Sequence, residues 1–352
     1  MLTLISVIIV LGLLIFFHEL GHFTVAKMVG IKVYEFSMGF GPKLLGFRKG
    51  ETSYNLRLFP LGGFVKMAGM DPNEDEEMAK AEGLEENPYY DSDQGFNKKS
   101  VLQRMAVIVA GPIMNFVLAT LIFASMAMYI GDPNVPARIS KVLPDKPAAQ
   151  AGLKPGDLIT AVNGEKVVRW DQLVQKIEAK GQRQITLTVE RAGQLKNIKV
   201  TPEVDGYSKR GIIGIQPQKP GVIRAVGLGV TYTGKVVVFL VDIVGKMITQ
   251  QIPSDGIGGP VRITMEIGKA AKHGILYVAQ MTAVLSVNLG LFNLFPIPAL
   301  DGSRLIFLLW EGLRGRPVDP SKENMIHLVG FGLLLLLMVF ITYNDISKIF
   351  IK

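Results

Sequence analysis

The hydrophobic positions of this chain are gathered into long runs separated by polar segments. Residues 105–130, 274–300 and 325–344 contain no Asp, Glu, Lys or Arg, and residues 1–26 contain one charged side chain, Glu19. Each run is long enough for a helix to cross a hydrocarbon layer about 30 Å thick. The pattern therefore predicts a polytopic α-helical membrane protein with four transmembrane helices, at about residues 2–28, 104–130, 275–295 and 325–343.

The polar segments predict further elements between the runs. Residues 33–67 show the alternation of a β-strand loop, with Tyr54, Leu56 and Leu58 on one face. Residues 71–95 hold ten acidic residues and one basic residue, which favours a solvated acidic loop, with a docking surface as the alternative. Residues 133–217 have the composition of a small soluble α+β module, with one amphipathic helix at residues 170–179.

A second amphipathic segment covers residues 222–250. At 100° per residue its aliphatic positions share one face, and Lys235, Asp242 and Lys246 lie together on the opposite face. This pattern predicts a helix lying on the membrane surface. A fifth span is the alternative, but it would bring Lys235 and Asp242 into the hydrocarbon layer at high cost. The aliphatic face consists of Val226, Val230, Val237, Val241, Val244 and Ile248.

Basic residues give the expected orientation. They cluster between the first two spans and between the last two, for example at Lys98, Arg104, Arg314 and Arg316. Because loops rich in Lys and Arg stay in the cytoplasm, both termini and the inserted module should lie on the outer side. We therefore expect a membrane core in two halves, residues 1–130 and 251–352, around the module and the surface helix.

Composition excludes several classes of protein. Only 19% of the residues are charged, below the roughly 25% of soluble domains, which argues against an ordinary soluble enzyme or a disordered chain. There is no cysteine, so disulfides and thiolate metal sites are excluded. The net charge of +8 has no basic stripe interleaved with aromatics, and anionic lipid headgroups account for it without nucleic acid.

The charged position in the first apolar run belongs to the sequence His18-Glu19-Leu20-Gly21-His22. On a helix, His18 and His22 lie one turn apart on one face and can reach a single metal ion. Glu19 lies beside that face, where it could act on water rather than bind the metal. The alternative is a polar patch facing a helix bundle, but a buried membrane Glu costs about 2.5 kcal/mol or more. The pattern favours a metal site.

A third ligand is expected near the end of the third run, where Asp301 is the first acidic residue after a long uncharged stretch. Pro296 and Pro298 must break a helix there. Broken backbone at membrane depth is tolerated only beside protein or a cavity, so a carboxylate at the break can turn toward a cation. A helix-terminal Asp at the membrane interface is the alternative.

Together these motifs resemble the site-2 protease family of intramembrane zinc metalloproteases, and most closely its bacterial regulator-of-sigma-E protease branch. The resemblance pairs His18-Glu19-x-x-His22 with a late Asn-x-x-Pro-x-Pro-x-Leu-Asp-Gly sequence that runs from Asn293 to Gly302. The chain departs from the family at Ser303-Arg304 and in having one soluble module. Further matches are Gly111-Pro112 with Asn115, Gly259-Pro260-Val261, residues 60–67 and residues 343–346.

The resemblance implies a zinc site and its chemistry. His18, His22 and Asp301 would bind Zn²⁺ and leave the fourth position to water. Glu19 would be the general base, taking a proton from the attacking water and passing it to the leaving nitrogen. Alternatives are a helix–helix hydrogen bond for Asn293 and a purely structural hairpin for residues 33–67. The implied substrate-binding residues are Asn293, Pro296, Pro298 and, in a membrane-associated β loop, Phe59, Gly62, Gly63, Phe64 and Val65.

The module at residues 133–217 resembles a PDZ domain. Residues 148–159, followed by Val162-Asn163-Gly164 and Trp170, carry this resemblance. A peptide would add as a strand beside residues 138–142, facing the helix at 170–179. The alternative is a steric gate that admits only trimmed substrates. The expected groove residues are Arg138, Ile139, Ser140, Lys141, Val142, Trp170, Leu173 and Ile177.

The expected function is hydrolysis of peptide bonds inside membrane-spanning segments, in a bacterial cytoplasmic membrane. Its partners would be single-pass membrane proteins already shortened outside, such as anti-sigma factors or remnant signal peptides, together with membrane lipid. An inactive membrane scaffold whose module collects peptides is the alternative. A transporter is disfavoured because no repeat halves occur, and an ATP-driven protease would need a GxxxxGK[ST] loop that the sequence lacks.

Overall fold

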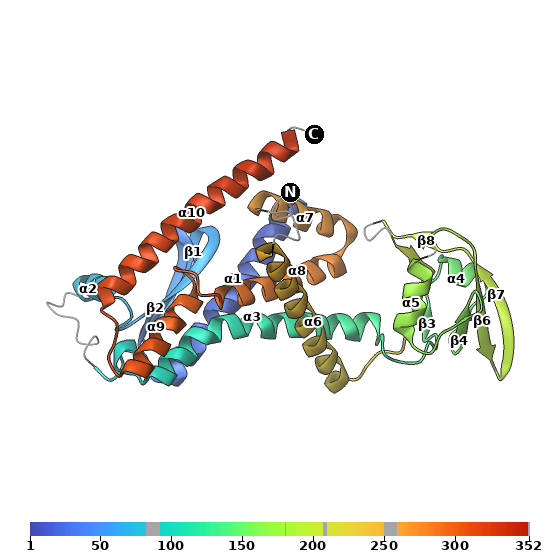
Figure 1. The fold of residues 1–352 in the computed structure, drawn as a ribbon, viewed down its shortest axis with the longest axis horizontal. Helices are drawn as coiled ribbons and strands as arrows, with labels where there is room; N and C mark the ends of the chain where they lie inside the picture. The colour runs from blue at the N-terminus through green and yellow to red at the C-terminus, as the bar shows by residue number, and fades with distance from the viewer. Residues whose placement is uncertain (82–91, 180, 207–209, 250–258, 351–352) are drawn as a thin grey trace. The chain divides into compact units, whose positions relative to one another are not determined.

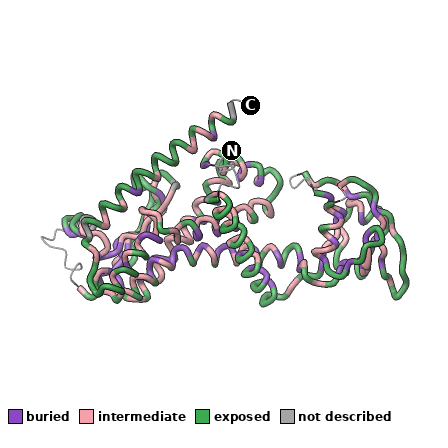
Figure 2. Tube along the Cα trace, in the orientation of Figure 1, coloured by how far each residue is buried: buried purple, intermediate pink, exposed green. Residues whose placement is uncertain are grey.

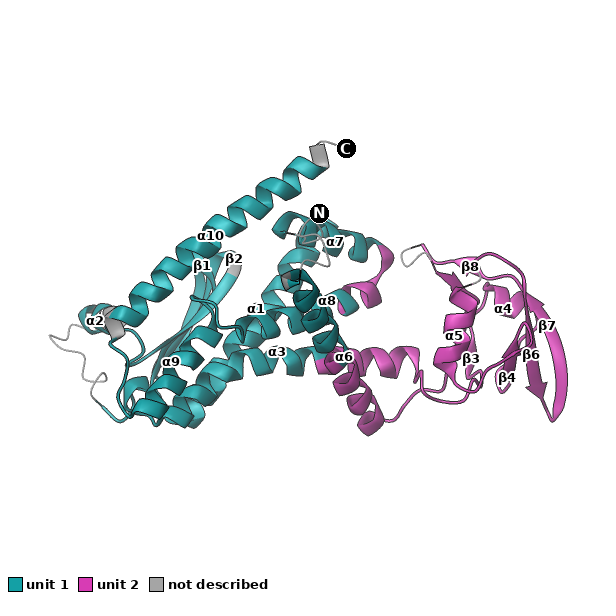
Figure 3. Cartoon of the chain, viewed as in Figure 1, with its two compact units in different colours: residues 1–119, 235–272, 280–352 teal, residues 120–234, 273–279 magenta. Residues whose placement is uncertain are grey.

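A computed structural model describes residues 1–81, 92–179, 181–206, 210–249 and 259–350. The chain divides into two units, shown in Figure 3. The first unit consists of residues 1–119, 235–272 and 280–352 and contains every proposed metal ligand. The second consists of residues 120–234 and 273–279 and contains the inserted module.

Five helices in the described part of the chain are long and apolar enough to cross a membrane. The chain is a multi-pass membrane protein, as its apolar runs predict. Four of these helices coincide with the predicted spans, whereas the fifth, α6, was expected to lie on the membrane surface. Because length and composition suit either placement, the number of spans stays a prediction. The helices are α1 (Leu2–Met28), α3 (Val101–Ile130), α6 (Val222–Ile248), α8 (Ile275–Asn293) and α10 (Pro320–Phe350).

Small residues allow α1, α3 and α8 to pack closely in the first unit (Figure 1). A Cβ on Gly21 of α1 would overlap the backbone of Ala110 in α3. On the other side of α3, a Cβ on Gly290 of α8 would lie 2.9 Å from the carbonyl oxygen of Pro112. Such close approach is typical of helix pairs in membranes. The motif on α1 is therefore held against α3 at short range.

The segment predicted as a β loop forms β1 (Val33–Lys49) and β2 (Thr52–Met67). Residues 33–38 pair with residues 63–67 and also with residues 53–56, so 33–38 lies between these two segments. No further strand in the described chain pairs with residues 63–67, which therefore form one edge of the sheet. Val33 and Met67 pack with Ala26 of α1 and with α3 in a shared apolar cluster.

The acidic segment differs in part from the expected solvated loop. Residues 72–81 form α2 (Pro72–Ala81), and Asp75 is buried although its neighbours are charged. Its carboxylate accepts hydrogen bonds from the Tyr34 hydroxyl at 3.0 Å and from the Gly69 amide at 2.9 Å. These two donors compensate for the lost hydration of the carboxylate. Residues 82–91 of the predicted loop lie outside the described residues.

Among the helices that were not predicted from the sequence are α7 (Pro260–His273) and α9 (Asp301–Arg314). Asp345 of α10 accepts hydrogen bonds from the amides of Gly259 and Arg262, and so caps the first turn of α7. Arg104 of α3 binds Glu311 of α9 through two hydrogen bonds. Both helices are thus tied to predicted spans through side chains distant in sequence.

The inserted module in the second unit is an α+β domain with its own core. A four-stranded antiparallel sheet has the order β5-β4-β6-β7, and α5 (Trp170–Glu178) packs against it. The buried stretches of the module are purple in Figure 2. The remaining elements are β3 (Lys141–Val142), α4 (Pro147–Gln150), β4 (Leu158–Val162), β5 (Glu165–Lys166), β6 (Ile185–Arg191), β7 (Gln194–Val200), β8 (Glu203–Val204), β9 (Gly211–Ile212) and β10 (Ile215–Gln216).

Candidate metal centre

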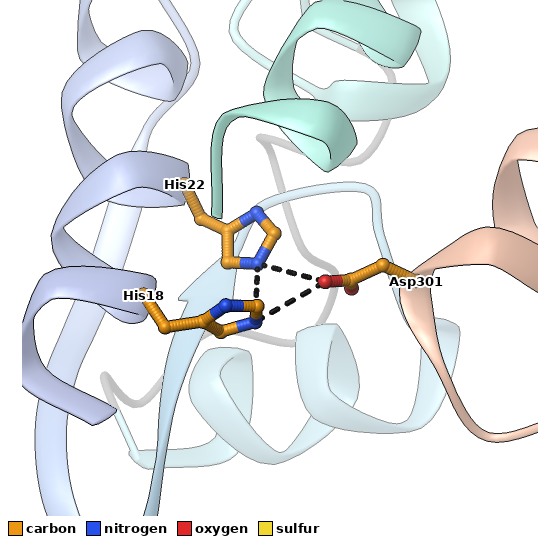
Figure 4. A group of neighbouring side chains, drawn as sticks. All are labelled: His18, His22 and Asp301. Carbon is orange, nitrogen blue, oxygen red and sulfur yellow. Dashed lines mark hydrogen bonds and ion pairs between the residues drawn. The ribbon is translucent and has the colours of Figure 1, made fainter. Parts of the chain in front are cut away.

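The two histidines of the motif lie one turn apart on α1, as their spacing predicts. Their Nε2 atoms are 3.3 Å apart. The rings meet edge to face, with centroids 4.9 Å apart, so both Nε2 atoms point to one place. Figure 4 shows this convergence, with Asp301 approaching from the opposite side.

Asp301 is delivered by a break in the chain between α8 and α9. Helix α8 ends at Asn293, residues 294–300 form a turn-rich loop, and Asp301 is the first residue of α9. The Asp301 Oδ2 atom lies 3.2 Å from Nε2 of His18 and 3.4 Å from Nε2 of His22 (Figure 4). The structure thus brings together three residues separated by about 280 positions in sequence.

The three donor atoms have the spacing of ligands around one zinc ion. Zinc binds nitrogen and oxygen ligands at about 2.0–2.1 Å in tetrahedral geometry, which separates neighbouring donors by roughly 3.3 Å. The observed separations are 3.2, 3.3 and 3.4 Å. Asp301 Oδ2 is also buried with no hydrogen-bond donor of good geometry. Two imidazoles and one carboxylate with an open fourth position are a donor set typical of catalytic zinc.

Gly302 explains why the loop can end so close to the histidines. A Cβ at this position would overlap the carbonyl groups of Leu294 and Phe295, so only glycine permits the fold of the loop onto α9. The hydroxyl of Ser303 donates to the carbonyl of Leu300 at 2.8 Å and closes the first turn of α9. The Asp-Gly pair of the motif is therefore a candidate metal ligand followed by the glycine that positions it.

The orientation of His22 is set by α3. Its Nδ1–H donates to the backbone carbonyl of Val107 at 2.8 Å, which leaves the lone pair on Nε2 facing Asp301. Gly111, one turn further along α3, lies so close that a Cβ there would overlap the His22 ring. Gly111 is part of the family resemblance, but its role could not be inferred from the sequence.

Asn115 of α3 contacts His18, the other histidine of the motif. Its side-chain nitrogen lies 3.1 Å from Nδ1 of His18, while its Oδ1 is buried without a partner. Exchanging the two amide atoms, which have nearly the same shape, would let Oδ1 accept a hydrogen bond from His18 Nδ1–H. His18 would then present the Nε2 lone pair that a metal requires. The reversed amide thus gives the unpartnered oxygen a donor and leaves His18 Nε2 able to bind a metal ion.

Glu19 follows His18 on α1 and lies beside the edge of the β-sheet. A Cβ on Gly63 would come within 2.9 Å of Glu19 Cγ, so the outer segment of β2 passes directly over this side chain. The Glu19 carboxyl is also within electrostatic reach of His18, His22 and Asp301. A sheet edge, a carboxylate and the converging donors therefore meet at one place.

The remaining predicted substrate-binding residues differ in their exposure and in their contacts. Asn293 donates its side-chain amide to the carbonyl of Leu289 within its own helix, at 3.0 Å. Pro296 is exposed, whereas Pro298 packs against Gly330 of α10. In the β loop, Phe59 is exposed and the backbone of Gly62 has φ 117°, which suits glycine. Phe64 stacks on Phe40, and Val65 packs against the apolar cluster beneath the sheet.

The predicted groove residues of the module lie in less open surroundings than expected. Trp170, Leu173 and Ile177 of α5 are buried in the module core, and so is Ile139. Residues 138 and 139 pair with residues 156–158, whereas residues 140–142 pair with β10, so the two ends of this segment have different partners. Ser140 and Lys141 face β10 in this pairing, and Arg138 bridges to Leu158. The sequence pattern predicted a strand at residues 138–142, whereas β3 covers only Lys141–Val142, because the two ends of the segment pair with different parts of the module. Peptide binding by the module stays a prediction.

A helical membrane core that carries an H-E-x-x-H helix and a converging aspartate defines a membrane metallopeptidase. Comparison with known proteins agrees: the profile of Peptidase family M50 matches residues 6–337. The chain belongs to Peptidase family M50.

Curated relatives match over nearly their whole length. Zinc metalloprotease RasP of Geobacillus kaustophilus is 36% identical, with 99% of each chain covered. Regulator of sigma-W protease RasP of Bacillus subtilis is 35% identical at the same coverage. A putative zinc metalloprotease of Agrobacterium fabrum is 38% identical, covering 97% of this chain and 95% of its own.

Among solved structures, the inserted module is similar to the PDZ domain of an SdrC-like protein from Listeria monocytogenes. That domain is 21% identical, with a TM-score of 0.21, and the match covers 23% of this chain and 85% of the domain.

Proposed function

We propose that this protein is an intramembrane zinc metalloprotease that hydrolyses peptide bonds within membrane-spanning segments of other membrane proteins. The observation that carries the proposal is the convergence of His18, His22 and Asp301 at separations of 3.2–3.4 Å beside Glu19. The names of the curated relatives support zinc as the metal.

His18, His22 and Asp301 would hold the zinc ion, and their outer partners Val107 and Asn115 would keep both imidazoles in the metal-binding tautomer. When bound, zinc supplies Lewis-acid polarisation of the peptide carbonyl and lowers the pKa of water. Glu19 would accept the proton of the attacking water and deliver it to the leaving nitrogen. Glu19 is suited to this shuttle because it lies beside the ligands without being one of them.

Substrate would bind along the free edge of β2. A helix hides its carbonyls in hydrogen bonds, so a membrane segment must become extended before attack. An unpaired strand edge stabilises an extended chain by main-chain hydrogen bonding. The edge at residues 63–67 passes over Glu19 at Gly63, which would bring the paired peptide to the catalytic side chain. We assign Phe59, Gly62, Phe64 and Val65 to the same binding element, with Asn293, Pro296 and Pro298 across the site.

The substrates we propose are single-pass proteins, already shortened outside a bacterial cytoplasmic membrane. The relative named regulator of sigma-W protease favours anti-sigma factors as one substrate class. The basic loops would face the cytoplasm, with both termini and the inserted module outside. Because both ends of the 138–142 segment are already paired with other parts of the module, we assign the module to a steric gate rather than to strand capture at that position.

The test uses purified full-length protein in detergent and a model transmembrane peptide. Glu19→Gln should retain one zinc per chain and lose cleavage, because the amide cannot accept the proton. His22→Ala should lose both zinc and cleavage, which separates metal binding from proton transfer. Undiminished cleavage by Glu19→Gln would contradict the mechanism, and a wild-type protein that binds no metal would contradict the site.

A further inference from the structure

The loop that delivers Asp301 is held from outside by α10. Pro296 and Pro298 have no amide N–H, and the hydrogen bonds within residues 294–300 run from Ile297 N–H to the Phe295 carbonyl at 2.7 Å and from Leu300 N–H to the Ile297 carbonyl at 3.1 Å. Between Pro298 and Leu300, Ala299 adopts φ 73°, the left-handed conformation that alanine seldom takes. A strained residue two positions from a metal ligand persists only where surrounding contacts hold it.

His327 supplies one of these contacts. The amide of Ala299 donates to Nδ1 of His327 at 3.2 Å. Because Nδ1 accepts, the proton of the neutral imidazole must be on Nε2, which faces the carboxylate of Glu323 at 3.8 Å. The side chain is 15% exposed and its ring packs edge to face on Phe307 of α9. Nε2 makes no hydrogen bond within the described residues, so the ring is held by the Ala299 hydrogen bond and by its packing on Phe307, with its lone pair on the loop.

Gly330 supplies the second contact, one turn further along the same face of α10. A Cβ on Gly330 would overlap Pro298, so the helix can approach the loop only because this position lacks a side chain. Elsewhere α10 is exposed along most of its length, as the green stretches in Figure 2 show. Contact with the ligand loop is thus one of the few places where α10 meets the rest of its unit.

We infer that His327 is a positioning residue for the metal centre. By accepting the Ala299 N–H it holds the left-handed turn that aims the Asp301 carboxylate at His18 and His22, and Gly330 lets it reach the loop. His327 does not touch the metal or the reacting atoms; it acts through the backbone. This inference rests on the proposed metal centre, and nothing in the sequence motif includes His327.

The test compares zinc affinity in purified full-length protein, measured by competition with a chromogenic chelator. His327→Leu removes the acceptor and should weaken zinc binding about 10- to 100-fold, the usual effect of losing an outer partner of a ligand. His327→Asn places a carbonyl oxygen near the position of Nδ1 and should restore most of the affinity. Cobalt-substituted protein should show an altered visible spectrum for the Leu variant and a nearly native one for the Asn variant.

Two glycines of α10 provide a matched pair that leaves the imidazole intact. Gly330→Ala should weaken zinc binding because its methyl group displaces Pro298, whereas Gly332→Ala has nothing within 4 Å and should bind zinc like the wild type. If His327→Leu does not fold, this pair and the Asn variant decide the question.

The inference is overturned if a folded His327→Leu variant binds metal with native affinity and spectrum, if Asn fails as badly as Leu, or if Gly330→Ala behaves like Gly332→Ala. A wild-type protein without bound metal would instead contradict the proposed function.

Discussion

Gly63 of the sheet edge lies directly over Glu19 of the motif helix: a Cβ added to Gly63 would be 2.9 Å from Glu19 Cγ. The same Cβ would be 2.9 Å from the carbonyl oxygen of Ser37 and 3.0 Å from Ile15 Cγ2, so position 63 has no room for a side chain. The proposed general base and the proposed substrate edge can therefore lie this close together only because position 63 has no side chain.

Gly63→Ala should lower cleavage about 10- to 100-fold, because a shift of about 1 Å between base and substrate is enough for such a loss. Zinc content should be unchanged, since no ligand touches Gly63. Cleavage of a transmembrane peptide and metal analysis on the same sample check this. Gly12→Ala, with nothing within 4 Å on the same helix as Glu19, is the control and should cleave normally.

Gly111→Ala should remove the metal rather than slow the reaction. Its methyl group would occupy the space of the His22 ring, so the imidazole must rotate away from Asp301. We expect zinc affinity to fall about 100-fold or more. Chelator competition measures the effect, with Gly234→Ala as a glycine that has open space around it. Native zinc affinity in Gly111→Ala would show that the His22 position is wrong.

Asn115 should act through an oxygen rather than a nitrogen. Asn115→Leu removes the partner of His18 Nδ1 and should weaken zinc binding about 10- to 100-fold. Asn115→Asp offers only acceptor oxygens and should bind zinc much better than the Leu variant. If Asn115→Leu binds zinc as tightly as the wild type, Asn115 has no role in orienting His18. If Asn115→Asp binds zinc more weakly than Asn115→Leu, the reversed amide is wrong.

The ion pair between Asp157 and Arg191 should make the stability of the inserted module depend on pH. Burial opposes ionisation of Asp157, but hydrogen bonds from Arg191 and from the Lys154 amide outweigh it and lower the pKa of the carboxyl below its usual value. A folded-state pKa below the unfolded one stabilises the fold above roughly pH 4, and this contribution is lost as pH falls through the folded pKa.

Arg191→Leu should therefore open the module more often at pH 7, and the difference from the wild type should shrink as the pH is lowered from about 4. Hydrogen exchange of module peptides in the full-length protein measures this. Arg169→Leu is the control, because its pair with Asp171 is half exposed and should contribute little. A difference that persists unchanged at low pH would mean that Arg191 acts through packing.

The parts of the fold that could be predicted are those with local signals. Runs of uncharged residues located α1, α3, α8 and α10, because crossing a hydrocarbon layer constrains every residue of the span. The sequence located the helix α6 but could not decide whether it lies on the membrane or crosses it, because its length and amphipathic pattern suit both positions. Helix α9 was not predicted because it begins directly after the proline-containing loop, which interrupts the apolar pattern of the third run.

The sequence by itself determined that this is a membrane protein with two histidines placed to reach one metal ion, because an apolar run and an i, i+4 spacing each lie within a single helix. The sequence also indicated Asp301, as the first acidic residue after a long uncharged run and as part of the family motif, but only the tertiary structure brings it to 3.2 Å from His18. The family resemblance already included Gly63 and Asn115, but only the structure shows what each of them contacts. Gly63, Asn115 and His327 meet Glu19, His18 and the 294–300 loop across segments far apart in sequence, and such contacts leave no periodic trace. Likewise, the burial of Trp170 and Leu173 depends on a sheet assembled from distant strands.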